Sequence, residues 1–196
     1  PQTPKLREVL VYDGAPEAGQ RGADALVAAA SDTDPPQTAG DEVAQTMIYT
    51  SGTTGKPKGV VRGAGNAQQT GALLGMMGYV PDDIYLTTGP LYHSGPGGFM
   101  GIAHVLGNTV LVQKKFDAED WLRLVDKYKV TTTFSAPTPV RLICNLPAAV
   151  KAKYDTSSMK RFIANAAPWS FALKQLYLAD FPGDSLFEIY GSTELG

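Results

Sequence analysis

The sequence predicts an α/β fold, a largely parallel sheet flanked by helices, on three observations. Short apolar runs alternate along the chain with longer segments of helical periodicity. The runs are apolar at nearly every position, as expected for strands with both faces covered. Glycine-rich or polar stretches follow the runs that end at Ser51, Asn165 and Tyr190. Since parallel sheets bind ligands beyond the carboxyl ends of their strands, these stretches predict one shared site.

The first 45 residues carry the weakest signals. The segment 7–13 contains a short apolar run and predicts a strand. An alanine-rich stretch over residues 23–31 predicts a short helix, which two prolines at 35 and 36 end. We therefore expect residues 1–45 to form a leading strand and a linker, and residues 46–196 to form the core that bears the motifs.

The core shows the alternation more clearly. Strands are predicted at 46–51, 84–88, 109–113, 130–136, 161–165 and 186–190, and helices at 66–78, 117–128 and 170–180. The helix that Asp117 caps is the clearest, because apolar residues recur at helical spacing from Trp121 to Tyr128. In the last helix, Leu173, Leu176 and Tyr177 are expected to face inward. The glycine-rich stretch PLYHSGPGGFMG is expected to be a turn region between two strands.

Composition excludes several classes of protein. The chain of 196 residues suffices for one large domain or two small ones, and its net charge of −2 offers no basic surface for nucleic acid. No apolar run reaches the about 18 residues of a transmembrane segment, and no secretory signal opens the chain. The single cysteine, Cys144, excludes an internal disulfide. It lies in an apolar run, which predicts a buried, unreactive thiol and fits a cytoplasmic protein.

The stretch TSGTTGKPKG, residues 50–59, has the composition of a phosphate-binding loop. Glycines allow backbone N–H groups to form a concave nest, while hydroxyls and lysines add donors and charge. It is not the P-loop of nucleoside triphosphatases: Thr50 stands where the first glycine would fall, and Pro57 replaces the Ser or Thr after Lys56. Composition alone leaves a solvated linker as an equal alternative.

Four motifs follow one another along the chain: YTSGTTGKPKGV at 49–60, PLYHSGP at 90–96, NAAP at 165–168 and YGSTE at 190–194. In this combination the sequence resembles the adenylate-forming superfamily, which includes acyl-CoA synthetases, aryl-CoA ligases, luciferases and adenylation domains of peptide synthetases. The resemblance covers nearly the whole chain. It implies that residues 1–196 are the central portion of the large N-terminal AMP-binding domain. The upstream start and the C-terminal domain with its catalytic lysine are expected to lie outside this sequence.

The resemblance implies a site for ATP and Mg²⁺. The phosphates would be held by the glycine-rich loop, through Thr50, Ser51, Gly52, Thr53, Thr54, Gly55, Lys56, Lys58 and Gly59. The adenine would lie between two segments, Ala166, Ala167 and Pro168 on one side and Tyr190, Gly191 and Ser192 on the other. Thr193 would hydrogen-bond the α-phosphate, and Glu194 would hold Mg²⁺, which prefers carboxylate and phosphate oxygens. The implied catalytic residues are Thr193, Glu194, His93 and Lys58.

The resemblance also implies that a small-molecule carboxylic acid is activated as an acyl-adenylate and then transferred to coenzyme A. The acid pocket would be lined by His93, Ser94, Gly95, Gly98, Pro137, Thr138, Asn165 and Trp169. These positions carry no second charged group, which favours an apolar acid. Fatty and aryl acids both fit, and a fatty or medium-length aliphatic acid is the preferred interpretation. Asn165 stands where relatives usually carry glycine. Trp169 would either shorten the pocket or only pack.

Other interpretations remain open at this point. The protein could be an aryl-CoA ligase, an adenylation domain that loads a carrier protein, or a nucleotide-binding fragment without turnover. Because the catalytic lysine is expected to lie outside the sequence, this chain alone should be inactive or very slow. Exposed sheet edges predict that it self-associates.

Overall fold

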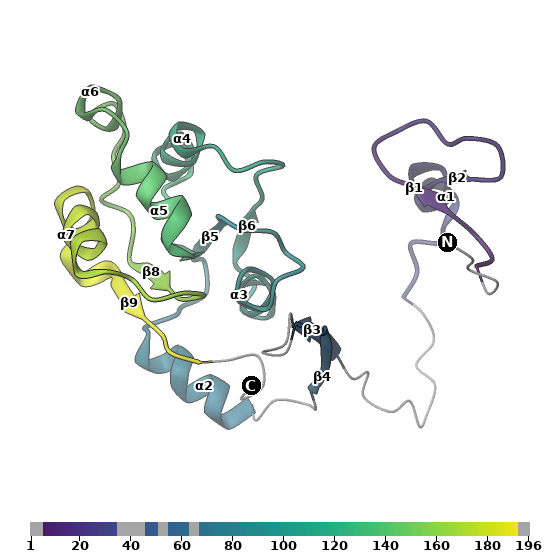
Figure 1. Cartoon of the computed structure of the whole chain (residues 1–196), viewed down its shortest axis with the longest axis horizontal. Coiled ribbons are helices and arrows are strands. Elements are labelled where there is room, and N and C mark those ends of the chain that lie inside the picture. Colours follow the sequence, from purple (N-terminus) through teal and green to yellow (C-terminus); the bar gives the residue numbers. More distant parts are fainter. Residues whose placement is uncertain (1–5, 35–45, 51–54, 63–66, 192–196) are drawn as a thin grey trace. The chain divides into compact units, whose positions relative to one another are not determined.

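The computed structural model describes residues 6–34, 46–50, 55–62 and 67–191 (Figure 1). The chain divides into two compact units, residues 1–42 and 43–196. In the first unit, β1 (Leu10–Val11) pairs in parallel with β2 (Arg21–Gly22), and α1 (Ala23–Ala29) follows directly. The strand expected over 7–13 is thus limited to two residues, whereas the short alanine-rich helix is confirmed.

The second unit contains a five-stranded parallel sheet. In spatial order its strands are β6 (Thr109–Leu111), β5 (Ile84–Thr87), β7 (Thr132–Ser135), β8 (Arg161–Ala164) and β9 (Leu186–Glu188). Every neighbouring pair runs parallel, and helices separate these strands along the chain. The sheet confirms the α/β class and brings the carboxyl ends of its strands to one edge.

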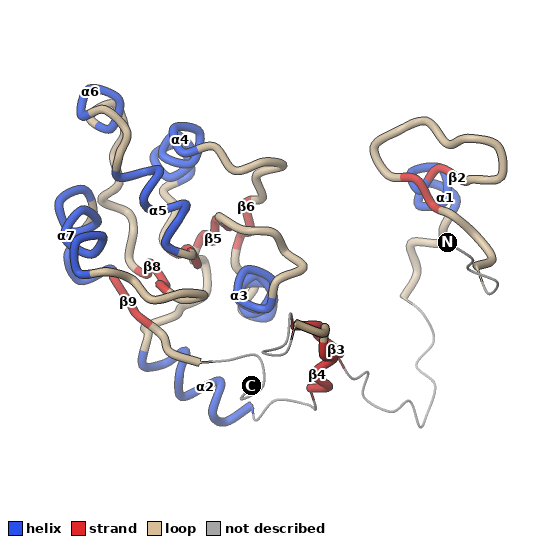
Figure 2. The backbone as a smooth tube through the Cα atoms, viewed as in Figure 1, coloured by secondary structure: helices blue, strands red, loops and turns tan. Residues whose placement is uncertain are grey.

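Helices cover both faces of this sheet, as Figures 1 and 2 show. One face is covered by α4 (Ala118–Tyr128), α5 (Pro137–Cys144) and α7 (Phe171–Asp180), and the other by α2 (Ala67–Met76) and α3 (Ser94–Val105). The short helix α6 (Ala148–Lys151) lies between α5 and β8 in the chain. This three-layer arrangement explains why the strands are apolar on both faces.

Successive strand residues alternate between two apolar cores. Leu86 and Phe162 belong to the core that contains Trp121 of α4. Their chain neighbours Tyr85 and Ile163 belong to the second core, on the face of α2 and α3. The alternation follows from the strand geometry, in which successive side chains point to opposite faces.

The helices α4 and α7 begin where the sequence predicts. Asp117 caps α4, accepting a hydrogen bond from the backbone N–H of Asp120 at 2.8 Å. Ser170 caps α7 in the same way. On α7, Leu173 and Tyr177 are buried as expected, but Leu176 is 43% exposed, so the expectation that it faces inward is wrong.

The strand expected at 46–51 exists, but it does not belong to the parallel sheet. β3 (Thr46–Thr50) pairs antiparallel with β4 (Lys58–Arg62) in a separate two-stranded sheet. The phosphate-loop motif therefore connects two strands of a hairpin. The expectation that it follows a strand of the parallel sheet is wrong, because a connection this short joins antiparallel neighbours.

The sequence predicts a turn region for the glycine-rich stretch 90–101. This prediction is wrong from Ser94 onward, where α3 begins. A Cβ at Gly95 would overlap the ring of Phe134, and a Cβ at Gly97 would overlap the carbonyl oxygen of Leu91. Close packing of α3 on the sheet at Gly95, and on the loop before it at Gly97, thus requires glycine at these positions. This packing outweighs the cost of placing glycine in a helix, which is about 1 kcal/mol per residue relative to alanine.

Two further predictions can be compared with the structure. Cys144 is buried, and burial raises the pKa of its thiol to about 12, so the thiol is protonated at neutral pH as predicted. Within the described ranges, no helix is both long and apolar enough to cross a membrane.

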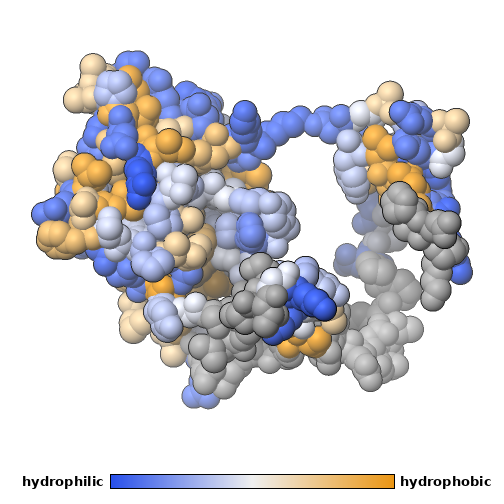
Figure 3. Space-filling view, viewed as in Figure 1, coloured by the Kyte–Doolittle hydropathy of each residue, from blue (hydrophilic) through white to orange (hydrophobic). Residues whose placement is uncertain are grey.

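Apolar and hydrophilic residues are interspersed on the face drawn in Figure 3, and Tyr49, Met76 and Val105 are among the exposed apolar side chains. Self-association stays a prediction.

Candidate functional site

Three adjacent strands end in one row at the carboxyl edge of the parallel sheet. Ser135 of β7 lies opposite Ala164 of β8, which lies opposite Glu188 of β9. The segment 165–168 after β8 and the segment 189–191 after β9 therefore leave the sheet side by side. This placement brings the segment 165–168 and the first residues of the YGSTE motif, Tyr190 and Gly191, to one edge of the sheet.

A single side chain connects these two segments. The Nδ2 of Asn165 donates a hydrogen bond to the carbonyl oxygen of Ile189 at 2.5 Å, and its Oδ1 accepts one from the N–H of Ala166. Ala166 has a φ of 71°, which costs a residue other than glycine roughly 1–2 kcal/mol. The hydrogen bond from the Ala166 N–H offsets part of that cost. Ala167 and Pro168 thus follow a tight turn that Asn165 supports.

Tyr190 faces solvent at this edge. Its side chain is 99% exposed, and the space beside Gly191 is open. A free aromatic ring next to an unobstructed backbone suits stacking against a flat base. Ser192, Thr193 and Glu194 lie outside the described residues, so their contacts with phosphate and Mg²⁺ stay predictions.

The phosphate-loop motif lies at the end of the hairpin. Thr50 of β3 pairs with Lys58 of β4, and Gly59 pairs with Tyr49. Gly55 has a φ of 78°, a conformation that glycine adopts readily. Lys56 and Lys58 are both exposed, so their ammonium groups are accessible to an anion. Ser51, Gly52, Thr53 and Thr54 lie outside the described residues.

The start of α3 places His93 at the same edge as the β8 and β9 segments, because α3 follows β5. His93 occupies the N-cap position with its ring exposed, and that ring lies 4.7 Å from the ring of Tyr92. The hydroxyl of Tyr85 on β5 donates a hydrogen bond to the carbonyl oxygen of Pro96, in the first turn of α3, at 3.2 Å. Burial raises the pKa of Tyr85 above its usual range, so this anchor stays protonated. The helix N-terminus adds partial positive charge here.

The residues expected to line an acid pocket differ in the space around them. Ser94 and Gly98 lie on α3, with open space beside Gly98, whereas the space beside Gly95 is filled by the Phe134 ring. Trp169 is 5% exposed and packs edge-on against Phe162, with 5.9 Å between ring centroids. Of the two alternatives for Trp169, the structure thus shows packing.

The helix α5 also starts at this edge, directly after β7, and was not predicted. Pro137 and Thr138 form its first turn; Pro137 is half-buried and Thr138 is exposed. Pro137 was the available signal, because proline is favoured in the first turn of a helix. Of the residues expected beside an acid, those at 93–98 and 137–138 thus lie at the starts of α3 and α5, whereas Asn165 and Trp169 follow β8.

The charges at the carboxyl edge are compatible with an anionic ligand. The carboxylate of Glu188, at the end of β9, is 2.6 Å from the ammonium of Lys174, which offsets its charge. Over the described ranges, no group of three or more His, Cys, Asp and Glu side chains could hold a metal. The carboxylate predicted for Mg²⁺, Glu194, falls beyond those ranges.

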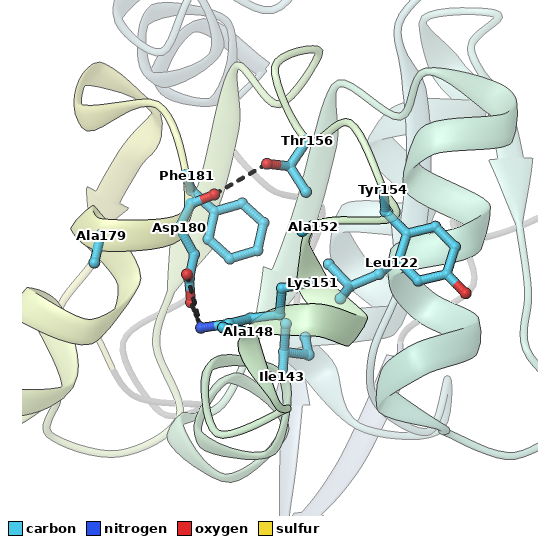
Figure 4. A pocket seen from close by; sticks show the side chains of 10 residues that line it. All are labelled: Leu122, Ile143, Ala148, Lys151, Ala152, Tyr154, Thr156, Ala179, Asp180 and Phe181. Carbon is cyan, nitrogen blue, oxygen red and sulfur yellow. Dashed lines mark hydrogen bonds and ion pairs between the residues drawn. The ribbon is translucent and has the colours of Figure 1, made fainter.

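A pocket of about 310 Å³ lies at the other end of the sheet (Figure 4). Apolar side chains, among them Leu122, Ile143 and Phe181, form much of its wall. Lys151 and Asp180 form an ion pair of 2.7 Å inside it. The lining segments come before β8 and β9, so this pocket is separate from the edge that carries the motifs.

Comparisons with known proteins agree with this arrangement. The family model described as "AMP-binding enzyme" matches residues 1–196. Over 161 residues the chain is 35% identical to 4-coumarate–CoA ligase 1 of Petroselinum crispum, covering 76% of this chain and 28% of that protein. It is 32% identical over 149 residues to 4-coumarate–CoA ligase-like 3 of Arabidopsis thaliana, covering 76% of this chain and 27% of that protein. The chain thus spans about a quarter of the length of these curated relatives.

A solved structure shows the same fold. The inhibitor-bound N-terminal domain of FACL13 from Mycobacterium tuberculosis superposes with a TM-score of 0.74 at 25% identity. The match covers 89% of this chain and 44% of that one.

Proposed function

The chain belongs to the AMP-binding enzyme family, the adenylate-forming superfamily that its motifs resemble, and from this membership we propose that the protein is an AMP-forming acid–thiol ligase. It would activate a carboxylic acid with ATP and transfer the acyl group to coenzyme A. One observation carries the proposal: the two segments implied to flank adenine, 165–168 and 190–191, follow adjacent parallel strands. Parallel sheets bind nucleotides at this edge.

The first half-reaction joins the acid to AMP. A carboxylate oxygen attacks the α-phosphorus of ATP, the bond from that phosphorus to the β-phosphate oxygen breaks, and pyrophosphate leaves. Lys56 and Lys58 would neutralise the β- and γ-phosphates and then the pyrophosphate, and Thr193 would hold the α-phosphate where charge develops. Tyr190 would stack on the adenine, opposite Ala166 and the two residues after it. In the second half-reaction a thiol sulfur attacks the acyl carbon and AMP leaves.

Mg²⁺ would supply neutralisation of phosphate charge when bound. Glu194 offers an oxygen donor of the kind this ion prefers, with phosphate oxygens and water completing the shell. It follows Tyr190 and Gly191 in the sequence at the edge implied to hold the nucleotide. His93, exposed at the start of α3, would lie near the carboxylate of the acid.

The acid is proposed to be apolar, since the pocket positions carry no second charged group. The sequence favours a fatty acid, but the curated relatives described above are named 4-coumarate–CoA ligases, so an aryl acid is an equal candidate. The open space beside Gly98 supports room for a chain or ring near α3, whereas the Phe134 ring fills the space beside Gly95. Cytoplasm is the proposed compartment, on the basis of the single buried thiol.

Acid-dependent exchange of pyrophosphate into ATP tests the proposal. The full chain is supplied with Mg–ATP and labelled pyrophosphate, together with either a medium-length fatty acid or a hydroxycinnamic acid. We expect slow exchange with at least one acid, because the lysine implied for catalysis is expected to lie outside this sequence, and a loss of at least tenfold in Lys58→Ala. Lys160→Ala is the matched control, because Lys160 is exposed just before β8, at the opposite end of the sheet. Absence of exchange with both acids, in a folded protein that binds ATP, would favour the nucleotide-binding alternative without turnover.

A further inference from the structure

The carboxamide of Asn165 extends the pairing of β8 with β9 beyond their last backbone pair. The ladder between the two strands ends at the pair Ala164 and Glu188. Past this pair, the N–H of Ile189 donates to the carbonyl oxygen of Ala164 at 3.0 Å. The Nδ2 of Asn165 then donates back to the carbonyl oxygen of Ile189 at 2.5 Å. The side chain thus takes the part that a further strand residue would play.

The same side chain also fixes the turn that follows β8. Its Oδ1 accepts from the N–H of Ala166, the residue with the left-handed φ of 71°. The backbone N–H of Asn165 donates to the carbonyl oxygen of Ser135 at 3.3 Å, which ties the turn to β7 as well. One residue therefore contacts the ends of three adjacent strands.

These contacts require a group that donates on one side and accepts on the other. A carboxamide has both an N–H donor and a carbonyl acceptor, whereas an aspartate carboxylate only accepts and glycine has no side chain. The chemistry of asparagine therefore matches both partners, the carbonyl oxygen of Ile189 and the N–H of Ala166.

We propose that Asn165 is a positioning residue, which sets the separation between the turn at Ala166–Pro168 and the segment Tyr190–Gly191. The inference rests on the proposed function, since these two segments are the ones implied to flank the adenine. It differs from the expectation that Asn165 lines the acid pocket, because both polar groups of its side chain bond to backbone. Asn165 thus contributes to the affinity for the nucleotide and does not change the affinity for the acid.

The test compares three variants of the full chain. Asn165→Asp keeps the acceptor for Ala166 and loses the donor to Ile189. Asn165→Ala and Asn165→Gly lose both groups, and glycine restores the residue usual in relatives. Asn145→Asp is the control, because Asn145 is exposed after α5 at the opposite end of the sheet.

We expect the KM for ATP to rise roughly threefold to tenfold in Asn165→Asp and at least as much in Asn165→Ala. The kcat and the KM for the acid should stay within about twofold of wild type. Amide hydrogen exchange should become faster at Ala166 in Asn165→Ala, and the ¹³C chemical shift of the Ile189 carbonyl should change in both variants. A rise confined to the KM for the acid would overturn the inference and return Asn165 to the acid pocket. Wild-type values of the KM for ATP in all three variants would overturn it as well.

The NMR measurement at the Ile189 carbonyl separates this inference from the proposed function. If wild type neither binds ATP nor exchanges pyrophosphate, the proposed function fails, and the nucleotide role of Asn165 falls with it. The bridge between the two segments is then still judged by the carbonyl ¹³C shift of Ile189. An unchanged carbonyl ¹³C shift of Ile189 in Asn165→Asp would refute the bridge whatever the protein binds.

Discussion

The buried ion pair between Arg161 and Asp83 yields a stability prediction that can be worked out from the structure. The side chain of Arg161, at the start of β8, is 5% exposed, and that of Asp83, just before β5, is 2% exposed. Asp83 also accepts hydrogen bonds from the N–H of Val80 at 3.1 Å and from the hydroxyl of Thr131 at 2.9 Å. Arg161 donates to the carbonyl oxygen of Gly78 at 2.7 Å. The pair thus holds β5, β7, β8 and the end of α2 together.

The substitution Asp83→Asn keeps the size of the side chain and removes its charge. The guanidinium of Arg161 is then left buried without a counter-charge, which costs about 3–5 kcal/mol. Since the free energy of unfolding of a domain is only about 5–15 kcal/mol, the variant should lose a large share of its stability. The matched control is Asp126→Asn, which breaks an exposed pair with Lys129 of 2.8 Å and should cost less than about 1 kcal/mol.

Urea unfolding of the two variants and wild type measures the difference. A third variant, Arg161→Met, and the double variant Asp83→Asn with Arg161→Met complete a double-mutant cycle. We expect the double variant to cost less than the sum of the single changes, because it removes both buried charges together. If Asp83→Asn costs no more than Asp126→Asn, the buried pair does not stabilise the fold and the reasoning is refuted.

Three further predictions concern local features. Gly95→Ala should destabilise the protein by about 1–3 kcal/mol, because its Cβ overlaps the Phe134 ring, whereas Gly98→Ala has open space and should stabilise it by up to about 1 kcal/mol, both measured by urea unfolding. Asp117→Ala removes the α4 cap and should lower the free energy of unfolding by about 1 kcal/mol, seen as a lower urea midpoint. An unchanged midpoint would show that the cap does not stabilise the protein. Hydrogen bonds from Ser157, then Lys129, lower the pKa of Asp155 to about 2, so its contribution to stability should be present above the ordinary Asp pKa and disappear as pH falls through about 2. A carboxyl titration by NMR with its midpoint near the ordinary Asp value would contradict this.

The sequence predicts elements whose signals are local. Helix α4 has a capping residue at Asp117 and an apolar face at helical spacing, so local chemistry and core packing agree. The segments after β8 and β9 were located because apolar strands followed by unusual loops mark the ligand edge of a parallel sheet. These predictions needed no knowledge of which strands are neighbours.

Features that depend on tertiary contacts were missed. The glycines of α3 argue against a helix in isolation, and the Phe134 ring and the Leu91 carbonyl oxygen explain two of them, Gly95 and Gly97. The pairing of β3 with β4 was missed because an apolar run does not reveal its partner or its direction. The hydrogen bond of Asn165 was missed for the same reason, since its partner Ile189 follows another strand, β9.

Calorimetric titration of Mg–ATP tests the central claim, that the edge beside β8 and β9 holds a nucleotide. The full chain is compared with Tyr190→Ala, which removes a ring that is 99% exposed and so disturbs no core. Tyr12→Ala, in the first unit, removes a ring that is 71% exposed and serves as the control. Base–aromatic stacking contributes about 1–3 kcal/mol, so Tyr190→Ala should weaken binding roughly 5-fold to 150-fold while Tyr12→Ala leaves it unchanged. Equal affinity in wild type and Tyr190→Ala, or no binding by folded wild type, would contradict the account.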